Sequence, residues 1–428
     1  MARPPAVPSA DRHPGALSAA AAVGLGLAGL AVIAAGTLGL TTVLVARTLI
    51  TPPRRRVEDT RVLSFDGNSV VLQRTADATI AGEYSLWFDG GRGHARLGEV
   101  VSHTDDTVTR RVLSVDFGDL TRARRGRLGG WFYLGPRELG YPYSRVDVPT
   151  TVGDAPAWLI PAAEDAGRWV IQVHGRAGQR SEGLRAVPVF RQHGYTSLLI
   201  SYRNDGDAPP SEDGRYALGD AEWLDVEAAI RFSLDSGARD IVLMGWSMGG
   251  AIVLQTVTRS KLAHAVRGVV LESPVVEWRT ALAFQAKAMR LPGVVRNGVL
   301  RLIASPFARR LTGQHRPIDL ERLDLVRRAP ILTLPILLLH SADDGFVPVD
   351  ASRALAAARP DVVRFEEFRH ARHTKLWNHD RDRWNAVIAD WLSSLEVSVP
   401  EAGVIERRAS GSTSPTRHRS ATASDAAS

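Results

Sequence analysis

RDIVLMGWSMGGAIVLQ, residues 239–255, is the most informative stretch of the chain. An apolar run typical of a buried strand leads into Gly-x-Ser-x-Gly, and a helical pattern follows. Glycine is needed on both sides of Ser247 because a Cβ there would crowd a strained turn. The helix directs its N-terminus at the serine, which favours a developing negative charge. The stretch predicts Ser247 as a nucleophile; the alternative is a glycine turn with an idle serine.

Strand-like and helical runs alternate on both sides of this element, from about residue 144 to residue 395. Such alternation predicts an α/β fold with a doubly wound, mostly parallel sheet. The last helix is indicated by apolar residues spaced i, i+3, i+4, i+7 and i+8 from Trp384. About eight strands are expected, at 145–148, 157–160, 169–173, 196–201, 241–245, 268–271, 336–340 and 362–365.

An acidic pair follows the predicted strand that ends at 340, in HSADDGFVP, residues 340–348. A carboxylate here would orient a catalytic base and stabilise its charged form. Asp344 is the preferred acid because of its distance from the Val-Pro that follows, and Asp343 is the second candidate. The alternative is a turn with two solvated acids.

Three histidines lie between the last predicted strand and the last helix, in RHARHTKLWNHD, residues 369–380. His373 is the predicted base, because His370 is too close to the strand end and His379 belongs to the helix entry. No further ligand at helical spacing supports a metal site, so none is predicted. The chain order Ser247, Asp344, His373 brings one nucleophile, one acid and one base to strand ends, where such sites lie.

In these motifs, residues 144–395 resemble the α/β-hydrolase superfamily, especially bacterial membrane-anchored hydrolases with one N-terminal span. The similarity rests on His174-Gly175, on 201–203 and 272–274, and on the segments around the three candidate residues. Many relatives have Gly directly before the catalytic histidine, whereas this chain has Arg372. The resemblance implies a small helical cap at about 277–329; ordinary sheet-covering helices are the alternative.

The resemblance also implies an oxyanion hole made of two backbone amides. One would come from Met248, directly after the nucleophile, and the other from Arg176 in the loop HGRAGQ, residues 174–179. Arg176 would act through its amide and not through its side chain. A glycine-rich surface loop is the alternative interpretation of 174–179.

The function implied is a serine hydrolase that cleaves a carboxylic ester of a small-molecule acyl substrate through an acyl-enzyme, without a cofactor. A serine peptidase or thioesterase on the same site is an alternative, because the fold does not fix the substrate. A non-catalytic, membrane-anchored binding protein on this fold is a rival from another class.

Residues 14–46 contain no charged side chain. The apolar stretch is longer than the hydrophobic core of a cleavable signal peptide and long enough to span a bilayer. We therefore predict a single-pass anchor over 16–46 behind an N-terminal tail of 1–15, with a long signal peptide as the alternative. The arginines at 47 and 54–56 favour a cytoplasmic catalytic domain, whereas large domains behind one N-terminal span are commonly exported. The side of the membrane stays open.

Short alternating runs separated by Asp-Gly turns predict a small β-rich domain over 57–143, in which we identify no catalytic residues. The α/β domain is assigned to 144–398. The tail of 399–428 has few apolar residues and is predicted to be disordered.

The chain of 428 residues has no cysteine and a formal net charge of +7. Disulfides, cysteine nucleophiles and thiolate metal sites are therefore excluded. The basic residues are scattered among acids and not concentrated on one element, so a nucleic-acid partner is not predicted.

Overall fold

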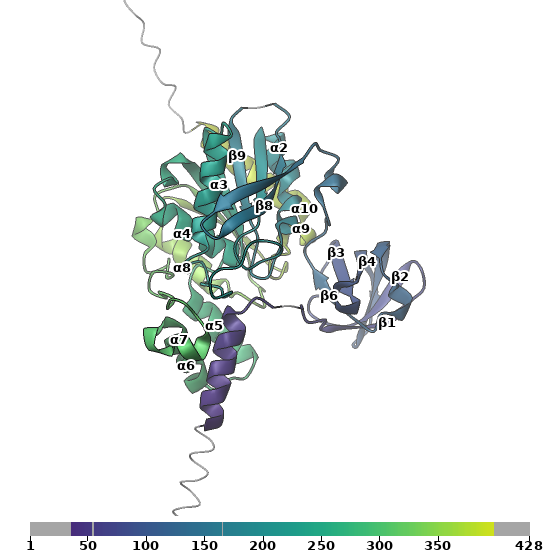
Figure 1. Cartoon of the computed structure of the whole chain (residues 1–428). Helices are drawn as coiled ribbons and strands as arrows, with labels where there is room; N and C mark the ends of the chain where they lie inside the picture. Colours follow the sequence, from purple (N-terminus) through teal and green to yellow (C-terminus); the bar gives the residue numbers. More distant parts are fainter. Residues whose placement is uncertain (1–35, 54, 165, 398–428) are drawn as a thin grey trace, which may run out of the picture.

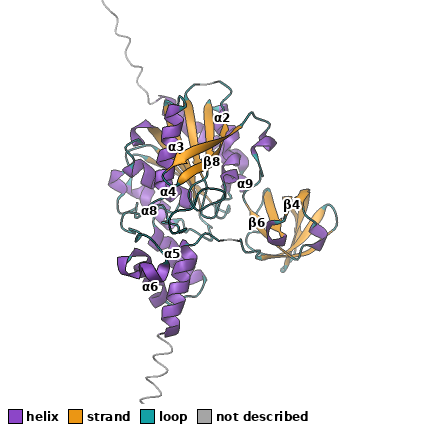
Figure 2. Ribbon diagram, in the orientation of Figure 1, coloured by secondary structure: helices purple, strands orange, loops and turns teal. Residues whose placement is uncertain are grey.

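The computed structural model describes residues 36–53, 55–164 and 166–397. These residues form an eight-stranded sheet covered by helices, a six-stranded closed barrel beside it, and a helix over 36–50 (Figure 1). Figure 2 shows that strands are confined to the sheet and the barrel, whereas the end of the molecule that carries the 36–50 helix is helical.

The large sheet contains each of the eight strands predicted from the sequence. Its order is β14-β13-β12-β11-β9-β10-β8-β7, and the pairs from β10 to β14 are parallel, whereas β8 is antiparallel to both neighbours. The predicted mostly parallel sheet is thereby confirmed. The strands are β7 (Ser144–Thr150), β8 (Gly153–Ile160), β9 (Arg168–Val173), β10 (Tyr195–Ile200), β11 (Asp240–Trp246), β12 (Val266–Glu272), β13 (Ile336–Ser341) and β14 (Val363–Phe368).

Helices cover both faces of this sheet, because the central strands are apolar on both faces. In β11, Ile241 and Leu243 belong to the core beneath α3, α4 and α8, whereas Val242 and Met244 belong to the core beneath α2 and α10. Successive side chains of a strand point to opposite faces, so one apolar run supplies both cores. The covering helices are α2 (Val187–Gln192), α3 (Trp223–Asp235), α4 (Met248–Arg259), α8 (Asp350–Ala358), α9 (Leu376–His379) and α10 (Arg381–Val397).

The predicted β-rich region contains a closed barrel with the strand order β1-β2-β5-β4-β3-β6. Its core is a separate cluster of buried side chains that includes Tyr84, Leu86, Phe88 and Leu97. Closure pairs every edge strand, so the small sheet leaves no free edge. The strands are β1 (Thr60–Phe65), β2 (Ser69–Gln73), β3 (Tyr84–Phe88), β4 (Gly93–His103), β5 (Thr107–Phe117) and β6 (Arg125–Gly129).

The barrel contacts the α/β domain at α9 through backbone and side-chain hydrogen bonds. The Glu83 amide donates to the Asn378 carbonyl oxygen at 3.2 Å, and the Asn378 side-chain amide donates to the Glu83 carbonyl oxygen at 2.8 Å. After β6, a Cβ on Gly130 would lie only 2.7 Å from the Thr374 carbonyl oxygen. Glycine at this position therefore lets the barrel backbone reach the loop that carries His373.

Helices also fill the segment between β12 and β13, where the cap was predicted. They are α5 (Trp278–Ala288), α6 (Gly293–Ala304) and α7 (Arg309–Thr312). Figure 1 shows them at one end of the molecule, beside the helix over 36–50. Short 3₁₀ helices connect other elements at 89–91, 120–122, 136–139, 180–186, 263–265, 306–308 and 329–331.

Most of the predicted anchor, 16–35, lies outside the described residues, as do the 1–15 tail and the predicted disordered tail 399–428. Residues 36–46 are helical, but this helix continues to Ile50, and the buried Ala46 and Ile50 join the core of the α/β domain. None of the helices in the described part of the chain has the length and apolarity to cross a bilayer.

Candidate active site

Ser247 lies on the sharp turn between β11 and α4. Its φ of 52° and ψ of −116° are unusual for a residue with a Cβ. A Cβ on Gly245 would lie 2.6 Å from the Gly249 backbone, and a Cβ on Gly249 would overlap the Val173 carbonyl group. The two glycines therefore allow the close approach of strand, turn and helix, as expected from the sequence.

The structure brings together the three residues predicted from strand-end motifs. The Ser247 Oγ lies 3.0 Å from His373 Nε2, and His373 Nδ1 lies 2.7 Å from Asp344 Oδ2. With Nδ1 donating to the carboxylate, Nε2 is left to accept the serine hydroxyl proton. This arrangement can remove a proton from Ser247 and hold the resulting imidazolium.

Asp344 is buried and held by two backbone amides. Its Oδ1 accepts from Phe346 N at 2.8 Å and from Val347 N at 2.9 Å, and Oδ2 lies 3.2 Å from His340 Nε2. Burial by itself would raise the pKa of Asp344, but His373, His340 and the hydrogen bonds together hold it well below the ordinary value. The carboxylate is therefore ionised at neutral pH, as an orienting acid requires.

The second candidate acid, Asp343, has a different position. Its Oδ1 accepts from Ser341 Oγ at 2.6 Å and from Arg372 N at 3.0 Å, so it fixes the loop before His373. His370 is exposed and makes no contact with the three residues. In the structure, Asp344 and His373 contact each other, whereas the alternative candidates Asp343 and His370 do not take part in this series.

Arg372 occupies the position where the resemblance leads one to expect glycine, and its φ is 60°, in the left-handed region. Its amide donates to Asp343, and its guanidinium donates to the Asp343 carbonyl oxygen at 2.9 Å and to Asp77 at 3.2 Å. Asp77 also pairs with Lys375 at 2.7 Å. Asp77, from the barrel, therefore binds Arg372 and Lys375, which lie on either side of His373 in the chain. These contacts help to compensate for the unfavourable backbone conformation of Arg372.

The predicted oxyanion loop packs directly on the serine. A Cβ on Gly175 would lie 3.2 Å from the Ser247 Cβ. Gly175 N donates to Glu182 Oε2 at 2.7 Å, and the Tyr202 hydroxyl donates to the Gly175 carbonyl oxygen at 3.0 Å. These bonds hold the backbone of Gly175, and with it the peptide group that contains the Arg176 amide.

The Arg176 side chain is committed elsewhere, in agreement with a role for its amide. The guanidinium donates to the carbonyl oxygens of Thr48 and Leu49, at 2.9 and 2.8 Å, at the end of the helix over 36–50. Within the described residues, the amides of Arg176 and Met248 have no acceptor. Both are free to donate to an oxyanion beside Ser247, which stays a prediction for these two residues.

Glu272, at the end of β12, joins three parts of the site from below. It is fully buried, and its Oε2 accepts from the indole nitrogens of Trp246 and Trp384, each at 2.9 Å. Its Oε1 accepts from the Leu376 amide at 3.3 Å. Burial raises the pKa of Glu272. One carboxyl group thereby links the serine strand, the histidine segment and α10.

Asp205 supports the oxyanion loop and provides a pH-dependent prediction. Its carboxylate accepts from the Ala177 amide at 3.0 Å and from the Tyr216 hydroxyl. Burial raises its pKa to about 7. Burial therefore penalises the charged form in the folded chain, so the contribution of Asp205 to stability is fully present below about pH 4 and is lost as the pH rises through about 7. Asp205→Asn should remove this loss, so the variant should gain stability relative to the parent between about pH 5 and pH 8, measured by urea unfolding.

Asp207→Asn is the matched control in the same loop. The pKa of Asp207 is lowered, chiefly by its hydrogen bond to Arg180, so its contribution is lost on acidification instead. If the free energy of unfolding of Asp205→Asn differs from that of the parent by the same amount at about pH 5 and at about pH 8, this account of Asp205 is wrong.

A cavity of about 270 Å³ opens beside Ser247 and His373. Barrel residues form one of its walls, and no residue of the predicted cap, 277–329, lines it. The predicted cap does not itself line the cavity, although Gln285 of α5 donates to the carbonyl oxygen of Phe346, a lining residue, at 3.3 Å; the side chains that line it from outside the α/β domain come from the barrel and from the linker before it. The barrel and linker contribute Arg56, Asp77, Arg127, Leu128, Gly129, Gly130 and Trp131.

These barrel residues were not identified from the sequence, where the region showed no catalytic pattern. Arg127 and Ser247 are far apart in the chain, and no local spacing indicates that they share a cavity. Among the described residues, no group of histidine, aspartate and glutamate side chains is arranged to hold a metal ion.

Two family models match the chain. Residues 170–411 match the model described as the alpha/beta hydrolase family, which is more than half of the chain. Residues 61–129 match a domain of unknown function, DUF8805, and this range contains nearly all of the barrel.

Two curated relatives are similar to part of the chain. Protein ABHD12B of Homo sapiens is 25% identical over 225 residues, which cover 49% of this chain and 55% of that protein. The uncharacterized protein YfhR of Escherichia coli is 26% identical over 146 residues, which cover 32% of this chain and 50% of YfhR. The chain thus spans about half the length of each of these relatives.

Solved structures of esterases are also similar. The Pyrococcus furiosus esterase Pf2001 has a TM-score of 0.48 and 18% identity, with 61% of this chain and 94% of that chain covered. The esterase RhEst1 from Rhodococcus sp. has a TM-score of 0.42 and 19% identity, with 59% of this chain and 99% of that chain covered.

Proposed function

The chain belongs to the alpha/beta hydrolase family, and from that premise we propose that it is a serine hydrolase that cleaves a carboxylic ester. The observation that carries the proposal is the hydrogen-bonded series from Ser247 through His373 to Asp344, with distances of 3.0 and 2.7 Å. Nucleophile, base and acid are in contact, and a cavity opens beside them.

In this mechanism His373 accepts the Ser247 proton as the Oγ attacks the ester carbonyl carbon. The amides of Met248 and Arg176 donate to the oxyanion, and His373 then protonates the leaving alcohol. Water, activated by the same histidine, releases the acid from the acyl-enzyme. Asp344 remains ionised throughout and stabilises the imidazolium.

A fluorophosphonate probe and a series of p-nitrophenyl esters test this function. The full-length chain should be labelled at Ser247 and should release p-nitrophenol, and Ser247→Ala should do neither. An unlabelled parent chain that hydrolyses no ester in the series would instead favour a binding protein on this fold.

We also propose that the chain is held in a membrane by its uncharged N-terminal segment, with residues 14–35 in the bilayer, because Ala46 at the end of the uncharged stretch is buried in the core of the α/β domain. The full-length protein should sediment with membranes and resist carbonate extraction, because a spanning helix leaves the bilayer only when detergent dissolves it. Recovery of the full-length chain, at its native size, in the soluble fraction would contradict the proposal.

A further inference from the structure

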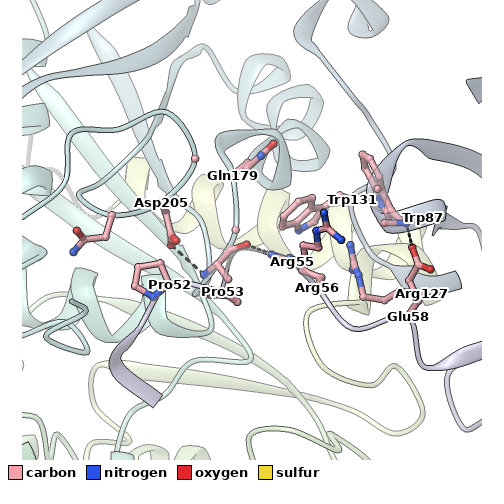
Figure 3. A pocket seen from close by; sticks show the side chains of 16 residues that line it. Pro52, Pro53, Arg55, Arg56, Glu58, Trp87, Arg127, Trp131, Gln179 and Asp205 are labelled. Carbon is pink, nitrogen blue, oxygen red and sulfur yellow. Dashed lines mark hydrogen bonds between the residues drawn. The ribbon is translucent and has the colours of Figure 1, made fainter. Parts of the chain in front are cut away.

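Two arginines border the serine from outside the α/β domain. Arg56, in the linker before β1, and Arg127, on β6, both line the cavity at Ser247 and a neighbouring cavity of about 510 Å³. Figure 3 shows them beside Trp131 in the larger cavity, and the Arg56 guanidinium lies 4.1 Å from the centre of the Trp131 ring. The two cavities therefore share a cationic border.

Neither guanidinium forms a direct ion pair with a carboxylate in the described part of the chain, although Glu58 and Asp59 act on the charge of Arg127, and Glu182 and Asp205 on that of Arg56, from a longer distance. Arg127 forms no ion pair or hydrogen bond there, and Arg56 donates to the neutral Ala177 carbonyl oxygen. Burial, and then the charge of Arg56, lower the pKa of Arg127 to about 10, so it stays charged at neutral pH. Two neighbouring, partly buried cations without a directly paired anion are unfavourable, and an anion bound between them would relieve this.

The carboxylates that line the same cavities already have partners. Glu182 accepts from Gly175 N, Asp77 pairs with Lys375, and Glu58 Oε1 accepts from Gly90 N at 2.6 Å. Asp205 accepts from Ala177 and Tyr216 (Figure 3 shows it on the far side from Arg127). The carboxylates near the two arginines thus accept hydrogen bonds from other groups or form ion pairs with them, and none of them pairs directly with either guanidinium.

We propose that the substrate carries an anionic oxyacid group, a carboxylate or a phosphate, which Arg127 and Arg56 bind while the ester lies at Ser247. This inference rests on the proposed esterase function and specifies its substrate class. The planar guanidinium suits either group, because its parallel N–H donors match two oxygens of a carboxylate or phosphate.

The test compares p-nitrophenyl hemisuccinate with its neutral methyl ester. Arg127→Gln should lower kcat/KM for the anionic ester by about tenfold more than for the neutral one, and Arg127→Lys should lose less. Arg124→Gln, an exposed arginine of the same barrel, is the matched control and should leave the ratio unchanged. An equal effect of Arg127→Gln on both esters would overturn the inference while Ser247-dependent hydrolysis persists.

A binding readout separates this inference from the proposed activity. Succinate or inorganic phosphate should raise the Tm of Ser247→Ala, and adding Arg127→Gln should remove the shift. Stabilisation by succinate alone would identify a carboxylate site, and stabilisation by phosphate alone a phosphate site. No shift with either anion, or a shift that survives Arg127→Gln, would contradict the proposed anion site.

A second, independent observation concerns the helical segment between β12 and β13. Residues 278–318, with α5, α6 and α7, contain eight basic residues and no Asp or Glu. Apart from Arg279, which pairs with Glu321, none of these forms an ion pair with a described residue. The others are Lys287, Arg290, Arg296, Arg301, Arg309, Arg310 and Arg316.

Large apolar side chains are exposed among these cations. Phe307 is 96% exposed, and its exposure in water is unfavourable. The helix over 36–50 adds further exposed leucines along the same end of the molecule (Figure 1). Other exposed members of this apolar and basic surface are Leu40, Leu44, Met289, Val294 and Leu311.

The 36–50 helix is attached to this surface by direct contacts. Arg47 Nε donates to the Leu311 carbonyl oxygen at 2.7 Å, and a Cβ on Gly298 would lie 2.7 Å from Thr42 Cγ2. In the sequence, the helix directly follows the uncharged residues 14–35. The surface therefore lies next to the segment proposed to enter the membrane.

We infer that α6, α7 and the adjoining 3₁₀ helix at 306–308 rest on an anionic bilayer, with Phe307 in the headgroup region and the arginines on lipid phosphates. Apolar insertion and electrostatic attraction to anionic lipid add together in such surfaces. This contact holds the α/β domain at a fixed distance and orientation relative to the bilayer, which a single membrane anchor would not do by itself.

Because the chain has no cysteine, one dye can be placed at one position. Full-length Phe307→Cys, labelled with a polarity-sensitive dye and reconstituted in phosphatidylcholine vesicles, should show a blue shift when phosphatidylglycerol is included. Charge reversal at Arg309 and Arg310 should remove it. Leu113→Cys, on the exposed face of the barrel, is the control and should show no shift.

The same emission at Phe307→Cys with and without phosphatidylglycerol would overturn the inference. A shift that depends on the protein-to-lipid ratio and not on the lipid charge would also overturn it, because that result identifies a second copy of the chain as the partner.

Discussion

Ser247→Ala is expected to lower kcat/KM by about 10⁴-fold or more, and His373→Ala added to it should cost little further. The two side chains act as one unit, because the base has no function without the hydroxyl whose proton it accepts. The 3.0 Å contact between them and the 2.7 Å contact to Asp344 are the structural basis of this expectation. Steady-state hydrolysis of the best p-nitrophenyl ester, in a complete double-mutant cycle, is the measurement.

Asp344→Asn belongs to the same experiment. The amide can accept from His373 but cannot stabilise the imidazolium, so activity should fall strongly while the fold is kept. His370→Ala is the matched histidine control, because this side chain is exposed and away from the serine. Asp343→Ala is unsuitable as a control, because the Asp343 carboxylate accepts from the Arg372 amide next to His373. Full ester hydrolysis by Ser247→Ala would refute the assignment of the nucleophile.

Arg110→Met is expected to destabilise the barrel by about 3 kcal/mol or more, the largest effect on stability that we predict. The Arg110 side chain is fully buried and gives five hydrogen bonds to four carbonyl oxygens. Methionine would fill much of the space but leave those oxygens without donors in a buried site. The acceptors belong to Ala78, Ile80, Gly82 and Gly98.

The same substitution should also reduce activity, since three of these carbonyls lie in the loop that follows Asp77. That loop presents Asp77 to Arg372 and Lys375 on either side of His373. Urea unfolding followed by tryptophan fluorescence, together with kcat, measures both effects. Arg111→Met is the control: its exposed pair with Glu99 should contribute less than about 1 kcal/mol. Equal stability of the two variants would show that the Arg110 hydrogen bonds matter little.

Much of the α/β domain could be predicted because its signals are local. The strand before Ser247, the glycine turn and the helix after it lie within 17 consecutive residues, and apolar periodicity marks each one. Asp344 and His373 could be placed for the same reason, since each directly follows a recognisable strand. Parallel strands bring their carboxyl ends to one edge, so the three residues were expected to meet.

The sequence did not decide between adjacent candidate residues as clearly, and it did not explain the residue before His373. Asp343 and Asp344 are adjacent, and only the folded loop shows which carboxylate faces the imidazole. Arg372 is accepted at a position that favours glycine, because Asp77, Asp343 and the surrounding backbone hold it there. Such compensation comes from residues distant in the chain and leaves no pattern in the local sequence.

The sequence alone therefore determined the sheet, the serine turn and the order of the candidate residues, since each depends on interactions within one element or between consecutive ones. Only the tertiary structure placed the barrel, and not the predicted cap, along the cavity at the active site. That position depends on docking contacts, such as Gly130 against Thr374 and Glu83 against Asn378, between residues more than 200 positions apart. Periodicity reports which face of an element is buried, but not which distant surface buries it.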